Sequence, residues 1–508
     1  MIMAAKQPNI LILMADQLTP SALPAYGNTV AKTPNIDALA AEGVVFESAY
    51  CNSPLCAPSR YSFMAGQLPS KIGAFDNAAE FAADIPTFAH YLRRAGYRTI
   101  LSGKMHFCGA DQLHGFEERL TTDIYPADFG WTPDWQRPEH RPSWYHNMSS
   151  VTQAGPCVRT NQLDFDDEVA AAARRKLFDI ARRERDRPFC LVMSMTHPHD
   201  PYAIGEEHWN RYREDDIDMP SVTLPPAALD PHSRRLRHVY DMDATPISAQ
   251  QIRNARRAYY GAVSYVDDQI GQIQRTLRET ALADDTIVML IADHGDMLGE
   301  RGLWYKMNFF EGASRIPLIV SAPGRFTARR VASSVSLVDL LPTLVELAGD
   351  GATPDYAAPL DGRSLLPHLA GTGGHDEVIG EYLAEGAIAP LIMIRRGRHK
   401  FVHSPGDPDQ LYDLTADRAE LHNLATEKPA APDLQRLRDE CAARWDLSRL
   451  REKVIASQRR RHLVAASLAI GAHHPWDFQP FADASRQFVR NHLDLDDIEA
   501  AARFPRIG

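Results

Sequence analysis

The chain has 508 residues, 44% of them hydrophobic, so it can bury a large core and is not a disordered protein. Its formal net charge of −11 repels phosphate backbones and argues against nucleic acid as a partner. No segment is apolar for long enough to span a bilayer, and the short apolar run near the start lacks the cleavage site of a signal peptide. Six cysteines without a CxxC pair fit a reducing compartment, so we expect a cytoplasmic protein without disulfides and without a membrane partner.

Five short apolar runs predict buried strands of a largely parallel sheet, because they are rich in Ile, Leu and Val and are separated by helical patterns. From Ala255 to Leu277, apolar residues recur at steps of three and four, which is typical of an amphipathic helix packed on a sheet. We therefore expect an α/β fold with helices on both faces. The predicted strands are Asn9–Met14, Tyr97–Leu101, Phe189–Met195, Thr286–Ile291 and Pro317–Val320.

The pattern changes in the last quarter of the chain. Leu391–Val402, followed by a PGDPDQ turn and LYDL, predicts a small antiparallel sheet, and Arg449–Arg461 predicts a charged helix. We expect a catalytic domain over 1–375, a smaller α+β subdomain over 376–450, and a helix with an aromatic tail over 451–508. The tail from Trp476 to Asp497 packs either on its own subunit or on a neighbour in a homo-oligomer, a dimer or tetramer.

Polar residues directly follow four of the predicted strands. In an open α/β sheet, ligands bind at the carboxyl ends of the strands. Any one of these residues could be a helix cap or a solvated loop residue, but four groups at separate strand ends predict a functional site. They are Asp16 and Gln17, Lys104 and His106, His197 and His199, and Asp293 and His294.

Three of these residues predict a metal site. Asp16 and Asp293 offer carboxylate oxygens, and His294 offers an imidazole nitrogen. This set suits a divalent cation such as Ca²⁺ or Mn²⁺ better than a thiolate-type zinc site.

The motif Cys56-Ala57-Pro58-Ser59-Arg60 is the sharpest local signal. Pro58 suits the first turn of a helix, which puts Cys56 at a helix N-terminus, where backbone N–H groups and the helix dipole favour an anion. This position suits a nucleophile that faces a sulfate or phosphate. The motif alone leaves open a buried structural cysteine, with Arg60 in a surface ion pair.

Taken in order, these motifs resemble those of the formylglycine-dependent sulfatases, whose signature C-x-P-S-R stands here at 56–60. The resemblance covers most of the chain and includes PNILILMADQ, GKMHF, THPHDPY and ADHGDMLGERG. It implies an alkaline-phosphatase-like sulfatase fold, a large mostly parallel sheet between layers of helices. It also implies that a formylglycine-generating enzyme oxidises Cys56 to formylglycine, whose hydrate attacks a small-molecule sulfate ester.

The resemblance implies a role for each matching position. The metal ligands would be Asp16, Asp293, His294 and the modified Cys56, with Arg60 holding the hydrate. The contacts to the sulfate or the departing oxygen would be Lys104, His106, His199 and Lys306. Among these, an imidazolium at His199 would protonate the leaving alkoxide, and His106 would act as a base.

Two positions relate the chain to one branch of the sulfatases. Gln17 and His294 stand where many sulfatases have aspartate and asparagine, as in the branch of choline sulfatases and phosphonate monoester hydrolases. They leave the metal open between Ca²⁺ and Mn²⁺. The stretch CNSPLCAPSRYSFMAGQLPSKIGAFDNAAEF and the tail WDFQPFADASRQFVRNH resemble choline sulfatases, so choline sulfate is the expected substrate. The alternatives are a phosphonate or phosphate monoester hydrolase and an arylsulfatase of the same superfamily.

Choline carries a quaternary ammonium, which aromatic faces and carboxylates recognise. The aromatic loop after Phe129 predicts Trp131 as the main contact to this cation. Asn77, His146 and a carboxylate of the tail are further candidates. The alternative is that these aromatic residues only pack the loop against a helix.

Overall fold

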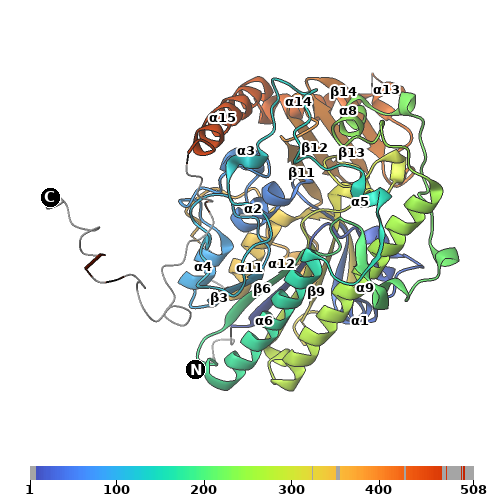
Figure 1. Ribbon diagram of the computed structural model, residues 1–508. Coiled ribbons are helices and arrows are strands. Elements are labelled where there is room, and N and C mark those ends of the chain that lie inside the picture. The colour runs from blue at the N-terminus through green and yellow to red at the C-terminus, as the bar shows by residue number, and fades with distance from the viewer. Residues whose placement is uncertain are drawn as a thin grey trace.

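An eight-stranded sheet lies at the centre of the protein (Figure 1). The computed structural model describes residues 7–322, 324–349, 355–427, 429, 431–471, 476, 494 and 496–497. The strand order is β10-β2-β9-β8-β1-β6-β3-β4. All five predicted strands belong to this sheet: β1 (Asn9–Ala15), β3 (Arg98–Gly103), β6 (Phe189–Met195), β8 (Thr286–Ala292) and β9 (Arg315–Ser321). Sequence analysis missed β2 (Val44–Tyr50), β4 (Glu118–Arg119) and β10 (Arg329–Ser336).

Four neighbouring strands of the sheet, β8, β1, β6 and β3, run parallel and end at the same level. The last residue of β1, Ala15, is level with Ala292 of β8 and with Met195 of β6. On the far side of β6, Gly103 at the end of β3 is level with Ser194. The residues that follow these strands therefore leave the sheet side by side. Only β9 runs antiparallel, to both β8 and β2, so the sheet is mostly parallel as predicted.

Helices cover both faces of the sheet (Figure 1). One group consists of α1 (Pro34–Glu42), α6 (Asn161–Arg183) and α9 (Ala249–Glu279), and the other of α2 (Cys56–Ala65), α4 (Phe88–Arg94) and α11 (Leu340–Ala348). A capping box between Ser248 and Gln251 starts α9, and its apolar stripe is buried as the spacing predicts.

A four-stranded antiparallel sheet follows the main sheet, as expected from the sequence. It consists of β11 (Glu377–Tyr382), β12 (Leu391–Arg396), β13 (His399–Ser404) and β14 (Asp407–Asp413). Leu434, Leu437 and Cys441 of α14 (Pro432–Arg444) share a small core with strand residues such as Ile392 and Phe401. The domain boundaries predicted at 375 and 450 stay a prediction.

The long helix α15 (Leu447–Leu468) returns to the main domain. Arg461 donates to both carboxylate oxygens of buried Asp76, at 2.6 and 2.7 Å, and to Thr132 Oγ1 at 3.1 Å. This buried pair attaches α15 to the loops that carry Asn77 and Trp131. After α15, Trp476 lies edge-on to Phe129, with 4.6 Å between ring centres.

The predicted tail of residues 476–497 lies largely outside the described residues. Within the described part of the chain, no helix combines the length and the apolar character needed to cross a membrane.

Candidate active site

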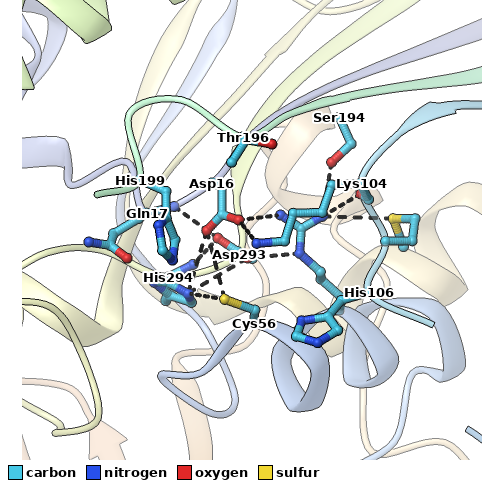
Figure 2. Close-up of polar contacts among 12 residues, drawn as sticks. Asp16, Gln17, Cys56, Lys104, His106, Ser194, Thr196, His199, Asp293 and His294 are labelled. Atoms are coloured by element: carbon cyan, nitrogen blue, oxygen red, sulfur yellow. Dashed lines mark hydrogen bonds and ion pairs between the residues drawn. The ribbon is translucent and has the colours of Figure 1, made fainter. Parts of the chain in front are cut away.

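The four strand ends bring seven of the eight predicted polar residues together around Cys56 (Figure 2). The eighth, His197, instead contacts Asp166, with 2.7 Å between Nδ1 and Oδ2. Asp16 and Gln17 follow β1, Lys104 and His106 follow β3, His199 follows β6, and Asp293 and His294 follow β8. All seven side chains are buried. Parallel strands that end at one level place these residues, which are far apart in sequence, within one cluster.

Cys56 is the first residue of α2, as the motif predicts, and its side chain is 1% exposed. Its Sγ lies 3.2 Å from His294 Nε2 and 3.9 Å from Asp16 Oδ1. Burial raises the pKa of the Cys56 thiol to about 11, and the neighbouring Asp16 carboxylate adds to this. The thiol is therefore protonated near neutral pH, and a protonated thiol is a poor nucleophile.

Arg60 is completely buried and joins the two aspartates, so the sequence alternative of a surface ion pair is wrong. Its Nε lies 2.8 Å from Asp293 Oδ2, and its Nη2 lies 3.4 Å from Asp16 Oδ2. Its Nη1 donates to Ser194 Oγ at 2.9 Å. Burial alone would lower the pKa of Arg60, but the two aspartates raise it. The guanidinium is fixed in place as a permanent charge.

Asp16 also contacts the ammonium group of Lys104. Burial disfavours the charged carboxylate, yet Lys104, with His199 and Arg60, holds the pKa of Asp16 well below its usual range. Asp16 is therefore ionised at neutral pH.

The donor atoms of Asp16, Cys56, Asp293 and His294 all lie within 4.8 Å of one another. His294 Nε2 lies 3.7 Å from Asp16 Oδ1 and 3.7 Å from Asp293 Oδ2. Adjacent ligands of a cation with bonds of 2.3–2.6 Å are about 3.3–3.7 Å apart. His294 Nδ1 lies 3.1 Å from the Gly295 carbonyl oxygen, which only accepts, so Nε2 presents its lone pair to the cluster. This donor set fits a divalent cation.

Lys306 and His199 form a hydrogen-bonded pair beside the cluster. Lys306 Nζ lies 2.7 Å from His199 Nε2 and 2.6 Å from Gln17 Oε1. His199 Nδ1 lies 2.5 Å from the Asp200 carbonyl oxygen, so Nδ1 carries the proton and Nε2 accepts from Lys306. Burial, with the charge of Lys306, holds the pKa of His199 well below its ordinary value. His199 is therefore neutral in this structure, which differs from the imidazolium expected from the sequence.

His106 lies at the edge of the cluster with a left-handed backbone, φ 59°. Within the described part of the chain, neither of its ring nitrogens has a hydrogen-bond partner. Burial, with the charge of Lys104, lowers the pKa of His106 to about 3. The ring is thus a neutral, weakly basic group that faces the site.

Trp131 and His146 belong to one aromatic cluster next to these residues. Trp131 is half-buried, and its ring lies 5.8 Å from His106 and 5.3 Å from Tyr125. His146 stacks on Tyr305 at 4.6 Å and lies 5.8 Å from His199. The cluster consists of Tyr125, Trp131, Trp144, Tyr145, His146, Tyr240 and Tyr305.

Asn77 and Trp135 have structural contacts. The Asn77 side-chain oxygen accepts from the Ala57 backbone N–H at 2.9 Å, so it fixes the first turn of α2 next to Cys56. Trp135 is buried and donates its indole N–H to the Ala384 carbonyl oxygen at 2.9 Å. Trp135 is thus part of the packing between the loop and the C-terminal subdomain.

Sequence analysis missed Glu385, which lies in the loop between β11 and β12. Glu385 is 4% exposed and has no ion pair with a lysine or arginine in the described residues. Tyr382 Oη donates to the Glu385 backbone carbonyl oxygen at 2.7 Å, and burial and the charge of Glu385 raise the pKa of Tyr145 and Tyr240, so Glu385 lies near these three rings. Burial raises the pKa of Glu385 to about 7. No local motif marks this residue, because its position depends on how the second sheet docks on the first.

Comparison with known proteins gives matches over most of the chain. The sulfatase family model matches residues 8–350, and the model of the choline sulfatase enzyme C terminal matches 452–504. The choline-sulfatase of Rhizobium meliloti (strain 1021) is 48% identical over 99% of this chain and 100% of its own length. Arylsulfatase K of Danio rerio is 28% identical over 85% of this chain and 83% of its own.

Among solved structures, the phosphonate monoester hydrolase of Agrobacterium radiobacter has the same fold, with a TM-score of 0.67 and 24% sequence identity over 88% of this chain and 96% of its own. The chain therefore belongs to the sulfatase family and is a sulfuric ester hydrolase.

Proposed function

We propose that this enzyme hydrolyses choline sulfate to choline and sulfate. The observation that carries the proposal is the buried carboxylate of Glu385, which has no ion-pair partner among the described residues and lies near Tyr145 and Tyr240 of the aromatic cluster. A trimethylammonium group cannot donate an N–H hydrogen bond, so aromatic faces and a carboxylate are the groups that recognise it. The full-length similarity to the choline-sulfatase of Rhizobium meliloti supports the same substrate.

The two ends of choline sulfate match the two halves of the site. The sulfate end carries a negative charge and suits the ammonium groups of Lys104 and Lys306. The choline end carries a positive charge and suits Trp131, His146 and Glu385. A buried carboxylate without a cation partner is costly, and a bound cation removes that cost.

A divalent metal, Ca²⁺ or alternatively Mn²⁺, would be held by Asp16, Asp293, His294 and the modified Cys56. When bound, such an ion polarises a sulfate oxygen as a Lewis acid. Arg60 and Lys104 hold the two aspartates in position and balance their charge.

Cys56 needs chemical conversion before it can serve as a nucleophile, since its thiol is protonated near neutral pH. A formylglycine-generating enzyme would act on Cys56. The hydrate of the resulting aldehyde has two hydroxyl groups, one to attack sulfur and one whose deprotonation expels sulfate. His106, whose ring nitrogens have no other partner in the described residues, would accept a hydrogen bond from that hydroxyl, and Arg60 would orient the hydrate.

The proton for the leaving alcohol would come from the Lys306–His199 pair. The proton of their shared hydrogen bond is on Lys306 Nζ, and the neutral His199 accepts this hydrogen bond at Nε2. As the S–O bond breaks, its electron pair stays on the choline oxygen and a proton from Lys306 completes the alcohol. Gln17 Oε1 holds Lys306 from the other side.

The proposal also covers the cellular compartment and the oligomeric state of the enzyme. All six cysteines are free thiols, which supports a reducing location such as the cytoplasm. We also propose a homo-oligomer, a dimer or tetramer.

The substrate preference is the first test. We expect kcat/KM for choline sulfate to exceed that for an aryl sulfate and for a phosphonate monoester by about 100-fold, the gain from cation recognition in a desolvated pocket.

Trp131→Ala should raise KM for choline sulfate about 3- to 30-fold, in line with a lost cation–π contact, and should leave KM for the aryl sulfate unchanged. Steady-state kinetics on the purified enzymes measures both.

The matched control is Trp209→Ala, which removes a tryptophan outside the aromatic cluster. Trp209 packs on Arg257. It should leave both substrates unaffected. Equal losses on both substrates in Trp131→Ala would mean that Trp131 only shapes the loop.

Conversion of Cys56 is visible by mass. The peptide that contains Cys56 should be lighter by about 18 Da than its unmodified form, because a carbonyl oxygen replaces the thiol and a hydrogen.

Cys56→Ala should abolish turnover, because it removes the nucleophile, while the fold, followed by circular dichroism, persists. Substantial activity in a verified Cys56→Ala preparation would contradict the nucleophile assignment.

Metal content tests the ligand set directly. Asp16→Asn and Asp293→Asn should weaken retention of the divalent ion by about 100-fold or more, because each removes a charged oxygen ligand. Elemental analysis after dialysis gives the metal per chain, independently of activity. Asp84→Asn, at an exposed position, is the control and should retain the metal. Equal metal content in all three variants would refute these ligands.

The pH dependence of KM tests Glu385. Its pKa is raised to about 7, so it is protonated and neutral below that pH. KM for choline sulfate should therefore rise by up to about tenfold per pH unit as the pH falls below about 7. In Glu385→Gln, KM for choline sulfate should be high at every pH. KM for an aryl sulfate should not change with pH in this range in the wild-type enzyme. A wild-type profile that is the same for both substrates would contradict a role for Glu385 in cation binding.

A further inference from the structure

Tyr125 contacts four groups of the site, although no motif marks it. It lies between β4 and the short helix η3 (Phe129–Trp131). Lys104 Nζ lies 3.9 Å above the centre of its ring. Its ring also lies 5.2 Å from His106 and 5.3 Å from Trp131. Tyr125 is thus the point where the sulfate-facing charges meet the aromatic cluster.

The hydroxyl of Tyr125 points to the leaving-group side. It lies 3.4 Å from each ring nitrogen of His199, the residue paired with Lys306. An O–H donor prefers about 2.7–2.8 Å, so both contacts are long. In the described residues these are its only hydrogen bonds, although the side chain is half-buried. A donor with only long contacts retains its capacity for a further acceptor.

Burial, with the charge of Asp16, raises the pKa of the Tyr125 hydroxyl well above its ordinary value. The group is therefore a neutral phenol that donates a hydrogen bond and keeps its proton.

The position of Tyr125 matches one atom of the substrate. In choline sulfate, the bridging oxygen links the sulfur to the carbon chain that carries the cation. Lys104 faces the sulfate end and Trp131 faces the cation, and Tyr125 touches both. This inference rests on the proposed function for the identity of these two ends.

We propose that the Tyr125 hydroxyl donates a hydrogen bond to the bridging oxygen of the sulfate ester and stabilises it as the S–O bond breaks. The electron pair of that bond goes to the bridging oxygen, and the proton that completes the alcohol comes from Lys306. The stabilisation is strongest for an alkoxide, the poorest leaving group, and is small for a nitrophenolate, which departs without help.

Tyr125→Phe isolates the hydroxyl, because the ring face under Lys104 remains. We expect kcat for choline sulfate to fall about 10- to 100-fold with KM changed less than about threefold, and kcat/KM for 4-nitrophenyl sulfate to fall less than about threefold. Across a series of aryl sulfates, the plot of log kcat/KM against leaving-group pKa should become steeper in the variant. A merely structural role would not change this slope.

Tyr356→Phe is the matched control, since Tyr356 lies far from the site and packs edge-on against Tyr91. It should leave both rates and the slope unchanged. Equal loss on alkyl and aryl sulfates in Tyr125→Phe, an unchanged slope, or no loss on choline sulfate would overturn the proposal.

The aryl series also separates this inference from the proposed function. If the wild-type enzyme fails to hydrolyse choline sulfate, the substrate assignment falls. The slope measured with aryl sulfates still decides whether Tyr125 acts at the leaving oxygen.

Discussion

The site depends on opposite charges being buried together at the carboxyl end of the sheet. Arg60 and Lys104 are fully buried, and so are Asp16 and Asp293, with which they pair. An isolated charge in the interior costs several kcal/mol, so none of the four would remain ionised alone. Their mutual pairing offsets that cost and brings two carboxylates and two cationic groups together, which suits a divalent cation and an anion at the same place.

The sheet makes this pairing possible. Asp16, Lys104 and Asp293 come from three parallel strands, and Arg60 comes from α2, which lies against the strand ends. Because the strands end at one level, a few buried residues from distant parts of the chain share one small volume. The same low-dielectric setting raises the pKa of the Cys56 thiol and lowers that of His199. Protonation states and metal affinity are therefore consequences of one packing arrangement.

The proposed leaving-group side consists of loops and not of strand ends. Tyr125, Trp131 and His146 lie on loops of the main domain, and Glu385 comes from the loop that connects the first two strands of the second sheet. The buried Arg461–Asp76 pair attaches α15 to the loops beside them. Loops vary more easily than strand ends, so a sulfate-binding centre of this family can be combined with different alcohol pockets.

The sequence by itself determined five of the eight strands of the main sheet, the position of Cys56 at a helix N-terminus, and the polar residues at four strand ends. It did so because buried strands, helix starts and strand-end ligands each have local patterns. Only the tertiary structure decided that Arg60 is a buried bridge, that His199 is neutral, and that Glu385 and Tyr125 lie next to residues of the predicted site. These properties depend on desolvation and on contacts between segments far apart in sequence, such as Lys104 with Tyr125, and no local pattern encodes them.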